Sequence, residues 1–345
     1  MSQMTERENY FRAIEYREPE RIPCKISFPT ATWSRYRDEL YEVIRRHPRI
    51  FGRQLGKVNY DDYGIQVRGK PWKDEWGCTW HFPINGLDGQ VVDHPLSDWS
   101  ALKVLRVPDP IAMRDWRKVR DGVRRAKSRG LLASDGPPHG SMFMRLHYLR
   151  GFANLMLDFA AEHPSLPDLI ATVRDYNIGF VKGLVECGVD MIGFGDDLGN
   201  QDRLPIRPEI FRRYLVPAYK DIFREAREAG VHVHFHSDGH ILEVIGDLAS
   251  AGVTVINPQS RANGIDELRE RCFGKICVDL DVDRQVVLPY GTPEDVRRHI
   301  EEVVLKLGSK KGGLWIIAGC YPDTPIRNIE ALCEAMEELQ CYYGQ

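Results

Sequence analysis

The sequence predicts a (β/α)8 barrel, an α/β fold in which parallel strands alternate with helices. From about residue 115, short apolar segments alternate with longer amphipathic ones, and the connections between them are short. This pattern implies parallel strands with helical crossovers. Seven strand segments occur, close to the eight of a barrel. The alternative, a doubly wound open sheet, is disfavoured because the chain lacks a dinucleotide-binding glycine fingerprint and a P-loop lysine.

Length and composition fit one large barrel domain. The chain has 345 residues, a length that also admits two domains, and 43% are hydrophobic. The net charge of -3 gives no reason to expect nucleic acid or an anionic membrane as a partner. No apolar run has the length of a membrane span, and the N-terminus has no secretory pattern, so we expect a cytoplasmic protein. The eight cysteines are scattered, which is not the pattern of a disulfide framework.

The N-terminal part precedes the regular alternation. Residues 5–16 are predicted to form a helix, because Thr5 and Glu8 fit a capping box and the apolar residues have helical spacing. A first strand is predicted over 22–28 and a helix over 33–50.

A hairpin excursion is predicted within residues 60–100. Residues 63–67 and 76–82 alternate like strands, and Gly86 and Gly89 supply turns. Five of the seven tryptophans lie between residues 33 and 99. Two interpretations stay open: a satellite aromatic core beneath the excursion, or an aromatic lid over a flat or apolar substrate.

The regular part of the chain supplies the other six strands and their helices. The strands are predicted at 131–134, 190–194, 231–238, 254–257, 275–280 and 314–318. The helical segments are predicted at 115–128, 145–162, 167–187, 208–229, 241–250, 265–272, 293–307 and 327–339.

The strand over 231–238 carries an unusual alternation of histidines and apolar residues. His232, His234, His236 and Asp238 share one parity, and the apolar residues Val231, Val233 and Phe235 share the other. In a strand, the histidines would therefore lie on one face. We expect His232 and His234 to pack inside the barrel, and His236 and Asp238 to reach its mouth.

Active sites of barrels lie at the carboxyl ends of the strands, so we expect the site residues to follow the predicted strands. Asp196 and Asp197 follow the strand over 190–194 and are the predicted catalytic carboxylates, although an aspartate pair can also cap a turn. The residues predicted to bind substrate at other strand ends and in the adjoining loops are Gln201, Asn257, Gln259, Asp279 and Tyr321.

A metal site is predicted from His236, Asp238 and Cys320. Imidazole, carboxylate and thiolate are all zinc ligands, and three protein ligands with an open position are the catalytic arrangement. On spacing alone, three other interpretations remain: a hydrogen-bonded barrel histidine, a buried thiol, and a nucleophilic pair formed by Cys320 and His236.

Six segments of the chain carry a family resemblance: Thr5–Glu8, Glu18–Pro23, Asp74–Gly77, Gly195–Gly199, His236–Gly239 and Thr324–Ile329. They resemble the uroporphyrinogen decarboxylase superfamily, which includes cobalamin-linked zinc methyltransferases. The resemblance covers nearly the whole chain, and its fold is a (β/α)8 barrel. The arginine-rich motif of true uroporphyrinogen decarboxylases is absent from residues 29–35, where the chain reads Pro-Thr-Ala-Thr-Trp-Ser-Arg.

The resemblance to the methyltransferase branch of this superfamily implies a set of zinc ligands and a methyl-transfer activity. That branch binds zinc through a His-x-Cys pair and a distant cysteine. His236 and Cys320 are similar to two of these ligands, whereas Asp238 stands where the middle cysteine would be. The implied function is a zinc-dependent methyltransferase that exchanges a methyl group with cobalamin on a separate corrinoid protein. The tryptophan-rich part of the chain would suit a methoxylated aromatic as substrate, and another small methyl donor is the alternative.

Two alternatives belong to other classes. A metal-free decarboxylase would use Asp196 or Asp197 to hold a pyrrole-like substrate. A non-catalytic barrel that binds a small molecule is the third hypothesis. A homodimer is compatible with all three.

Overall fold

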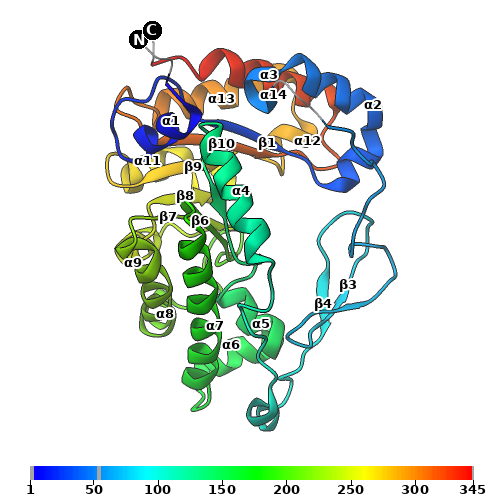
Figure 1. The fold of residues 1–345 in the computed structure, drawn as a ribbon, viewed down its shortest axis with the longest axis vertical. Helices are drawn as coiled ribbons and strands as arrows, with labels where there is room; N and C mark the ends of the chain where they lie inside the picture. The colour runs from blue at the N-terminus through cyan, green and yellow to red at the C-terminus, as the bar shows by residue number, and fades with distance from the viewer. Residues whose placement is uncertain (1–3, 53–55, 344–345) are drawn as a thin grey trace. The chain divides into compact units, whose positions relative to one another are not determined.

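The computed structural model describes residues 4–52 and 56–343, and Figure 1 shows its helices and strands. The chain divides into two compact units, each discontinuous in sequence. The single domain predicted over 1–345 stays a prediction. The first unit consists of Met1–Glu8, Lys73–Trp80 and Val91–Pro258, and the second of Asn9–Trp72, His81–Gln90 and Gln259–Gln345.

The first unit holds four parallel strands in the order β5-β6-β7-β8. Long helices α7 and α8 connect them and run side by side (Figure 1). The strands are β5 (Ser134–Asp135), β6 (Met191–Gly195), β7 (His232–Ser237) and β8 (Val255–Pro258). The helices are η1 (Trp99–Val104), α4 (Trp116–Ser128), α5 (Phe143–Arg150), α6 (Phe152–Ala161), α7 (Leu166–Cys187), α8 (Pro208–Glu228) and α9 (Ile245–Ala251).

The second unit holds three parallel strands in the order β1-β10-β9. Helices α13 and α14 pack against each other. The strands are β1 (Cys24–Ser27), β9 (Cys277–Asp281) and β10 (Leu314–Gly319). The helices are α2 (Thr30–Arg46), α3 (Pro48–Phe51), α10 (Ser260–Asn263), α11 (Ile265–Cys272), α12 (Val287–Tyr290), α13 (Pro293–Leu307) and α14 (Ile326–Leu339), and α1 (Glu6–Ile14) precedes β1 in the chain.

The seven predicted strands are all present among the described residues. Two predicted helices are divided. Residues 145–162 form α5 and α6 because Gly151 adopts a φ of +80° between them. Residues 33–50 belong to α2 and α3, which are separated at His47 by the proline that begins α3.

The hairpin excursion is confirmed in part. Strands β2 (Trp72–Lys73), β3 (Thr79–His81) and β4 (Gln90–Asp93) form a three-stranded sheet, with Gly86 and Gly89 between the last two. The predicted strand over 63–67 is wrong. Gly64 has a φ of +53°, and the amide of Gln66 donates to the carbonyl of Tyr63, so this segment turns.

The tryptophans of the first unit pack as a satellite core. Trp76 is only 4% exposed, and its ring meets Tyr176 edge-to-face at 4.9 Å. Trp80 donates to Asp74 Oδ2, and its ring packs edge-to-face on Tyr148. These contacts favour the packing interpretation over a lid.

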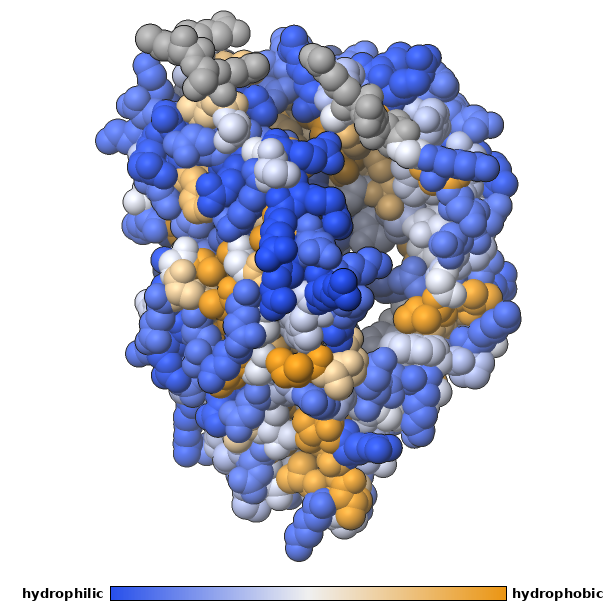
Figure 2. Space-filling view, viewed as in Figure 1, coloured by the Kyte–Doolittle hydropathy of each residue, from blue (hydrophilic) through white to orange (hydrophobic). Residues whose placement is uncertain are grey.

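The surface is largely polar on the face drawn in Figure 2, with separate apolar areas. Across residues 4–52 and 56–343, no helix combines the length and the hydrophobicity needed to cross a bilayer.

Candidate functional site

Strand β7 has the two-faced pattern that its sequence predicts. Val233 and Phe235 are fully buried, and Phe235 packs edge-to-face on Tyr219 of α8 at 5.4 Å. Among the histidines, His232 is 6% exposed, whereas His236 is partly exposed at the carboxyl end of the strand. The apolar face thus fixes the strand against α8 and leaves the opposite face for polar chemistry.

His236 is held by contacts on both ring nitrogens. Its Nδ1 lies 2.7 Å from Oδ1 of Asn257, at the end of the neighbouring strand β8. Because an amide oxygen only accepts, Nδ1 carries a proton. Nε2 lies 3.1 Å from Asp238 Oδ1 and 3.7 Å from Asp197 Oδ1. Nε2 is therefore the nitrogen that faces the carboxylates, either as a protonated donor or, where a metal ion lies between them, as a metal ligand.

The two adjacent aspartates occupy different environments. Asp196 is fully buried, and its oxygens accept from the amides of Met142, Phe143 and Met144 at 2.9, 2.7 and 2.7 Å. The hydroxyl of Tyr219 donates to the same carboxylate at 2.6 Å. Asp196 thus binds the N-terminus of α5, a structural task.

Burial has the largest effect on the pKa values of Asp196 and Tyr219. It raises the pKa of Asp196, although the four donors oppose the shift. Burial and the nearby Asp196 charge also raise the pKa of Tyr219 well above its ordinary value, so its hydroxyl remains a donor at neutral pH. A catalytic role for Asp196 stays a prediction, and this geometry does not favour it.

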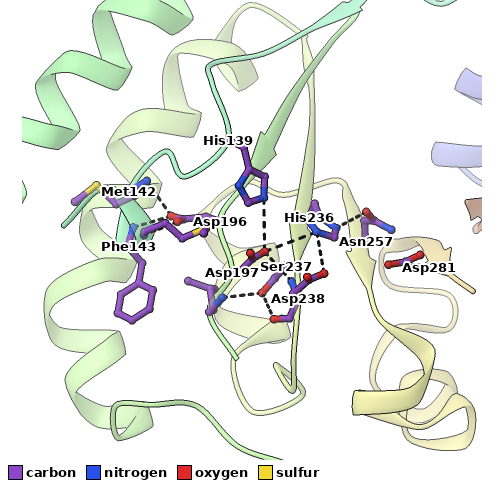
Figure 3. A network of polar contacts seen from close by, with 12 residues as sticks. His139, Met142, Phe143, Asp196, Asp197, His236, Ser237, Asp238, Asn257 and Asp281 are labelled. Atoms are coloured by element: carbon purple, nitrogen blue, oxygen red, sulfur yellow. Dashed lines mark hydrogen bonds and ion pairs between the residues drawn. The ribbon is translucent and has the colours of Figure 1, made fainter. Parts of the chain in front are cut away.

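Asp197 faces the opposite way, toward two histidines (Figure 3). Its Oδ1 lies 3.6 Å from His139 Nε2 and 3.7 Å from His236 Nε2, and it accepts from the amide of Asp238 at 3.0 Å. Burial by itself would raise the pKa of Asp197, but the contact with His139 and the positive charges of His139 and His236 lower it to about 2. Asp197 is therefore ionised at neutral pH and supplies a fixed negative charge.

His139 is a site residue that sequence reasoning missed. It lies exposed in the loop between β5 and α5; partial desolvation by itself would lower its pKa, but Asp197 raises it. Its ring lies against Gly195 of β6, where a Cβ would approach the ring within 2.2 Å. In the sequence, the feature that could have marked His139 as a site residue is its position shortly after a predicted strand.

The structure places the other predicted residues as follows. Gln201 is exposed in the loop after β6, and Asn257 orients His236. In the second unit, the hydroxyl of Tyr321 lies 3.1 Å from an Arg284 nitrogen. Gln259 and Asp279 are buried there, at 7% and 6% exposure. Their roles in substrate binding stay predictions.

Cys320 also belongs to the second unit, and its pairing with His236 and Asp238 stays a prediction. Its thiol is fully buried, its amide donates to Ser27, and its carbonyl accepts from the hydroxyl of Thr32 at 2.8 Å. Burial, and secondarily the charge of Asp281, raises the pKa of this thiol.

A metal ion fits the donor set of the first unit. One ligand atom from each of His139, Asp197 and His236 lies within 4.8 Å of the others. Imidazole nitrogen and carboxylate oxygen are ligands for zinc and for other divalent ions. The proton on His236 Nδ1 leaves Nε2 as the nitrogen that faces such an ion.

Parallel strands with helical crossovers and titratable residues at the strand ends are the architecture of an α/β barrel enzyme. The family model of uroporphyrinogen decarboxylase matches residues 73–339, most of the chain. The chain belongs to the uroporphyrinogen decarboxylase family. This confirms the resemblance inferred from sequence.

Individual relatives fall into two activities. A uroporphyrinogen decarboxylase of Carboxydothermus hydrogenoformans is 24% identical over 177 residues, which cover 50% of this chain and 47% of that protein. A methylcobamide:CoM methyltransferase, MtbA, of Methanosarcina mazei is 28% identical over 175 residues, which cover 51% and 50%. The chain thus matches about half the length of each of these relatives.

A solved structure shares the fold over almost the entire chain. A methyltransferase from Methanosarcina mazei superposes with a TM-score of 0.69 at 17% identity and covers 97% of this chain and 99% of its own. This likeness confirms the predicted α/β barrel class. At this identity it shows the fold alone.

Proposed function

We propose that the chain is a zinc-dependent methyltransferase of a corrinoid-linked system, with its metal at the end of β7. The observation that carries the proposal is the position of His236, whose Nδ1 is fixed by Asn257 and whose Nε2 faces Asp197 and Asp238. The sequence likeness to a methylcobamide:CoM methyltransferase supports it.

The proposed ligands follow the family resemblance. The ligand set that this resemblance implies is His236, Asp238 and Cys320. Bound zinc supplies Lewis acidity that polarises a substrate oxygen or lowers the pKa of a substrate thiol. Asn257 keeps the His236 ring in one orientation, and the ionised Asp197 favours a cationic or proton-donating group beside it.

The partner in this proposal is a separate protein that carries cobalamin. The methyl group passes between its cobalt and a small substrate, such as a methoxylated aromatic. A thiol acceptor is the second substrate class, because the MtbA relative is named for transfer to CoM.

The test is methyl transfer by the purified full chain. Methylcobalamin with a small thiol measures one direction, and reduced cobalamin with a methoxylated aromatic measures the other; the cobalamin absorbance reports both. We expect zinc-dependent turnover that His236→Ala abolishes. The control is Asp202→Asn, at an exposed residue of the loop after β6, and it should retain full turnover.

The second candidate is a decarboxylase, favoured by the uroporphyrinogen decarboxylase relative. It would need no metal, and Asp197 would hold the substrate. Consumption of uroporphyrinogen by metal-free protein, without methyl transfer to or from cobalamin in the presence of zinc, would replace the methyltransferase proposal with this one.

A further inference from the structure

We infer that the metal site of this chain is completed within the first unit by His139, Asp197, His236 and Asp238, with no sulfur ligand. This differs from the ligand set that the family resemblance predicts, because it adds His139 and Asp197 and does not require Cys320. The inference deepens the proposed function, on which its catalytic meaning rests. Metal binding itself can be measured without methyl transfer.

The distances suit a shared ion better than direct hydrogen bonds. Asp197 Oδ1 is 3.6 Å from His139 Nε2 and 3.7 Å from His236 Nε2. Both separations exceed the usual 2.7–3.2 Å of a hydrogen bond. Ligand atoms that surround a tetrahedral zinc at about 2.1 Å lie about 3.4 Å apart. These two separations are therefore within a few tenths of an ångström of ligand spacing, and all three ligand atoms lie within 4.8 Å of one another.

Asp238 is the fourth donor that we infer, beyond the three residues whose ligand atoms lie within 4.8 Å of one another. Its Oδ1 is 3.1 Å from His236 Nε2, and its backbone amide donates to Asp197 Oδ1 at 3.0 Å. Both carboxylates thus lie at the same nitrogen of His236, on the side opposite the Asn257 contact (Figure 3). Ligating carboxylates and histidines commonly have such supporting hydrogen bonds.

The backbone leaves space for the His139 ring. At Gly195 a Cβ would lie 2.2 Å from His139 Cδ2 and 2.8 Å from Nε2, so any larger residue would displace the ring. Two residues earlier on the same strand, a Cβ at Gly193 would meet nothing within 4 Å. The glycine at position 195 therefore allows the His139 ring to lie where it does, whereas the glycine at position 193 has no such effect.

Charge and ligand type define the class of ion. With neutral imidazoles, the two carboxylates give the four residues a formal charge of -2, which a divalent cation neutralises. A set of nitrogen and oxygen donors accepts Zn²⁺, Co²⁺, Fe²⁺ or Mn²⁺, whereas thiolates favour softer ions. The site that we infer is harder than a histidine–cysteine zinc site.

The experiment measures Co²⁺ and Zn²⁺ binding to the metal-free full chain. We expect one equivalent of Co²⁺, with a visible spectrum that lacks the near-ultraviolet band of a cobalt–thiolate bond. His139→Ala should weaken binding by about 100-fold or more, and Gly195→Ala by about 10–100-fold, the range seen when support of a ligand is lost. Gly193→Ala and Cys320→Ser should bind as tightly as the unchanged protein. Circular dichroism confirms that each variant is folded.

Three outcomes overturn the inference: no stoichiometric metal in the unchanged protein, undiminished binding by His139→Ala, or a thiolate band that disappears in Cys320→Ser. Methyl transfer is then assayed on the same preparations. Sulfur-free binding without transfer refutes the proposed function but not this site. Transfer that depends on a metal held by Cys320 refutes this site but not the proposed function.

Discussion

Replacement of Tyr219 by phenylalanine tests whether the buried Asp196 is a structural carboxylate. The substitution removes one oxygen, which donates to Asp196 Oδ2 at 2.6 Å. It leaves in place the ring, which packs between Phe223 and Phe235 at centroid distances of 5.6 and 5.4 Å. The three amides at the start of α5 still bind the carboxylate, so the fold should persist with one charged hydrogen bond fewer.

The expected cost follows from that single bond. A hydrogen bond to a charged group contributes about 1.5–3 kcal/mol, and both partners are fully buried here. We therefore expect Tyr219→Phe to lower the free energy of unfolding by about 2 kcal/mol. The matched control is Tyr214→Phe on the same helix, whose hydroxyl donates to Glu162 at the surface and should contribute less than about 0.5 kcal/mol.

Urea unfolding followed by circular dichroism measures the loss. Hydrogen exchange of a peptide that covers α5 gives a local readout, because the amides of Met142, Phe143 and Met144 donate to Asp196. Faster exchange there is expected in Tyr219→Phe and not in Tyr214→Phe. Equal stability of the two variants would refute the idea that Tyr219 stabilises a buried charge.

Three further predictions concern the first unit. Asp196→Asn should cost about 3 kcal/mol in urea unfolding, because one acceptor oxygen becomes an NH₂ group that faces a helix amide; a neutral result would contradict a structural role. His147 has its pKa lowered to about 4, chiefly by burial. Its neutral form therefore stabilises the fold above about pH 6.5, and this stability should be lost as the pH falls through about 4; His147→Gln should flatten that pH dependence in unfolding measured between pH 7 and 4. Gly239→Ala should lower stability by about 2 kcal/mol or more, because φ is +79° and its Cβ would lie 2.1 Å from the Gly199 carbonyl oxygen; an unchanged melting temperature would show that these loops separate readily.

The repeat of strands and helices was predictable because it depends on periodic burial. Strand β7 reads as alternating residues, and helix α13 begins and ends at the predicted residues 293 and 307. Breaks within helices were harder to predict from the sequence. The division at Gly151 depends on one positive φ, which a glycine permits but does not require.

The candidate site was predictable only where one strand supplies both residues. His236 and Asp238 share a parity, so their approach follows from strand geometry alone. His139 lies 58 residues before Asp197 in the chain, and its place depends on the bare backbone of Gly195. The different tasks of Asp196 and Asp197 follow from which element each one faces, and adjacent residues in sequence carry no such information.

Residue 238 gives the sharpest remaining test, because it is where this chain departs from the methyltransferase pattern. An aspartate in place of cysteine suits a site that also uses His139 and Asp197, since each choice favours nitrogen and oxygen donors over sulfur. Asp238→Cys should therefore restore a softer site: its Co²⁺ complex should gain a thiolate band, and its preference for Cd²⁺ over Mn²⁺ should rise by about 10-fold or more. Asp202→Cys places a thiol at an exposed position of the loop after β6 and should produce neither effect. A Co²⁺ spectrum unchanged by Asp238→Cys would show that residue 238 does not bind the ion, and the four-residue set would then reduce to His139, Asp197 and His236.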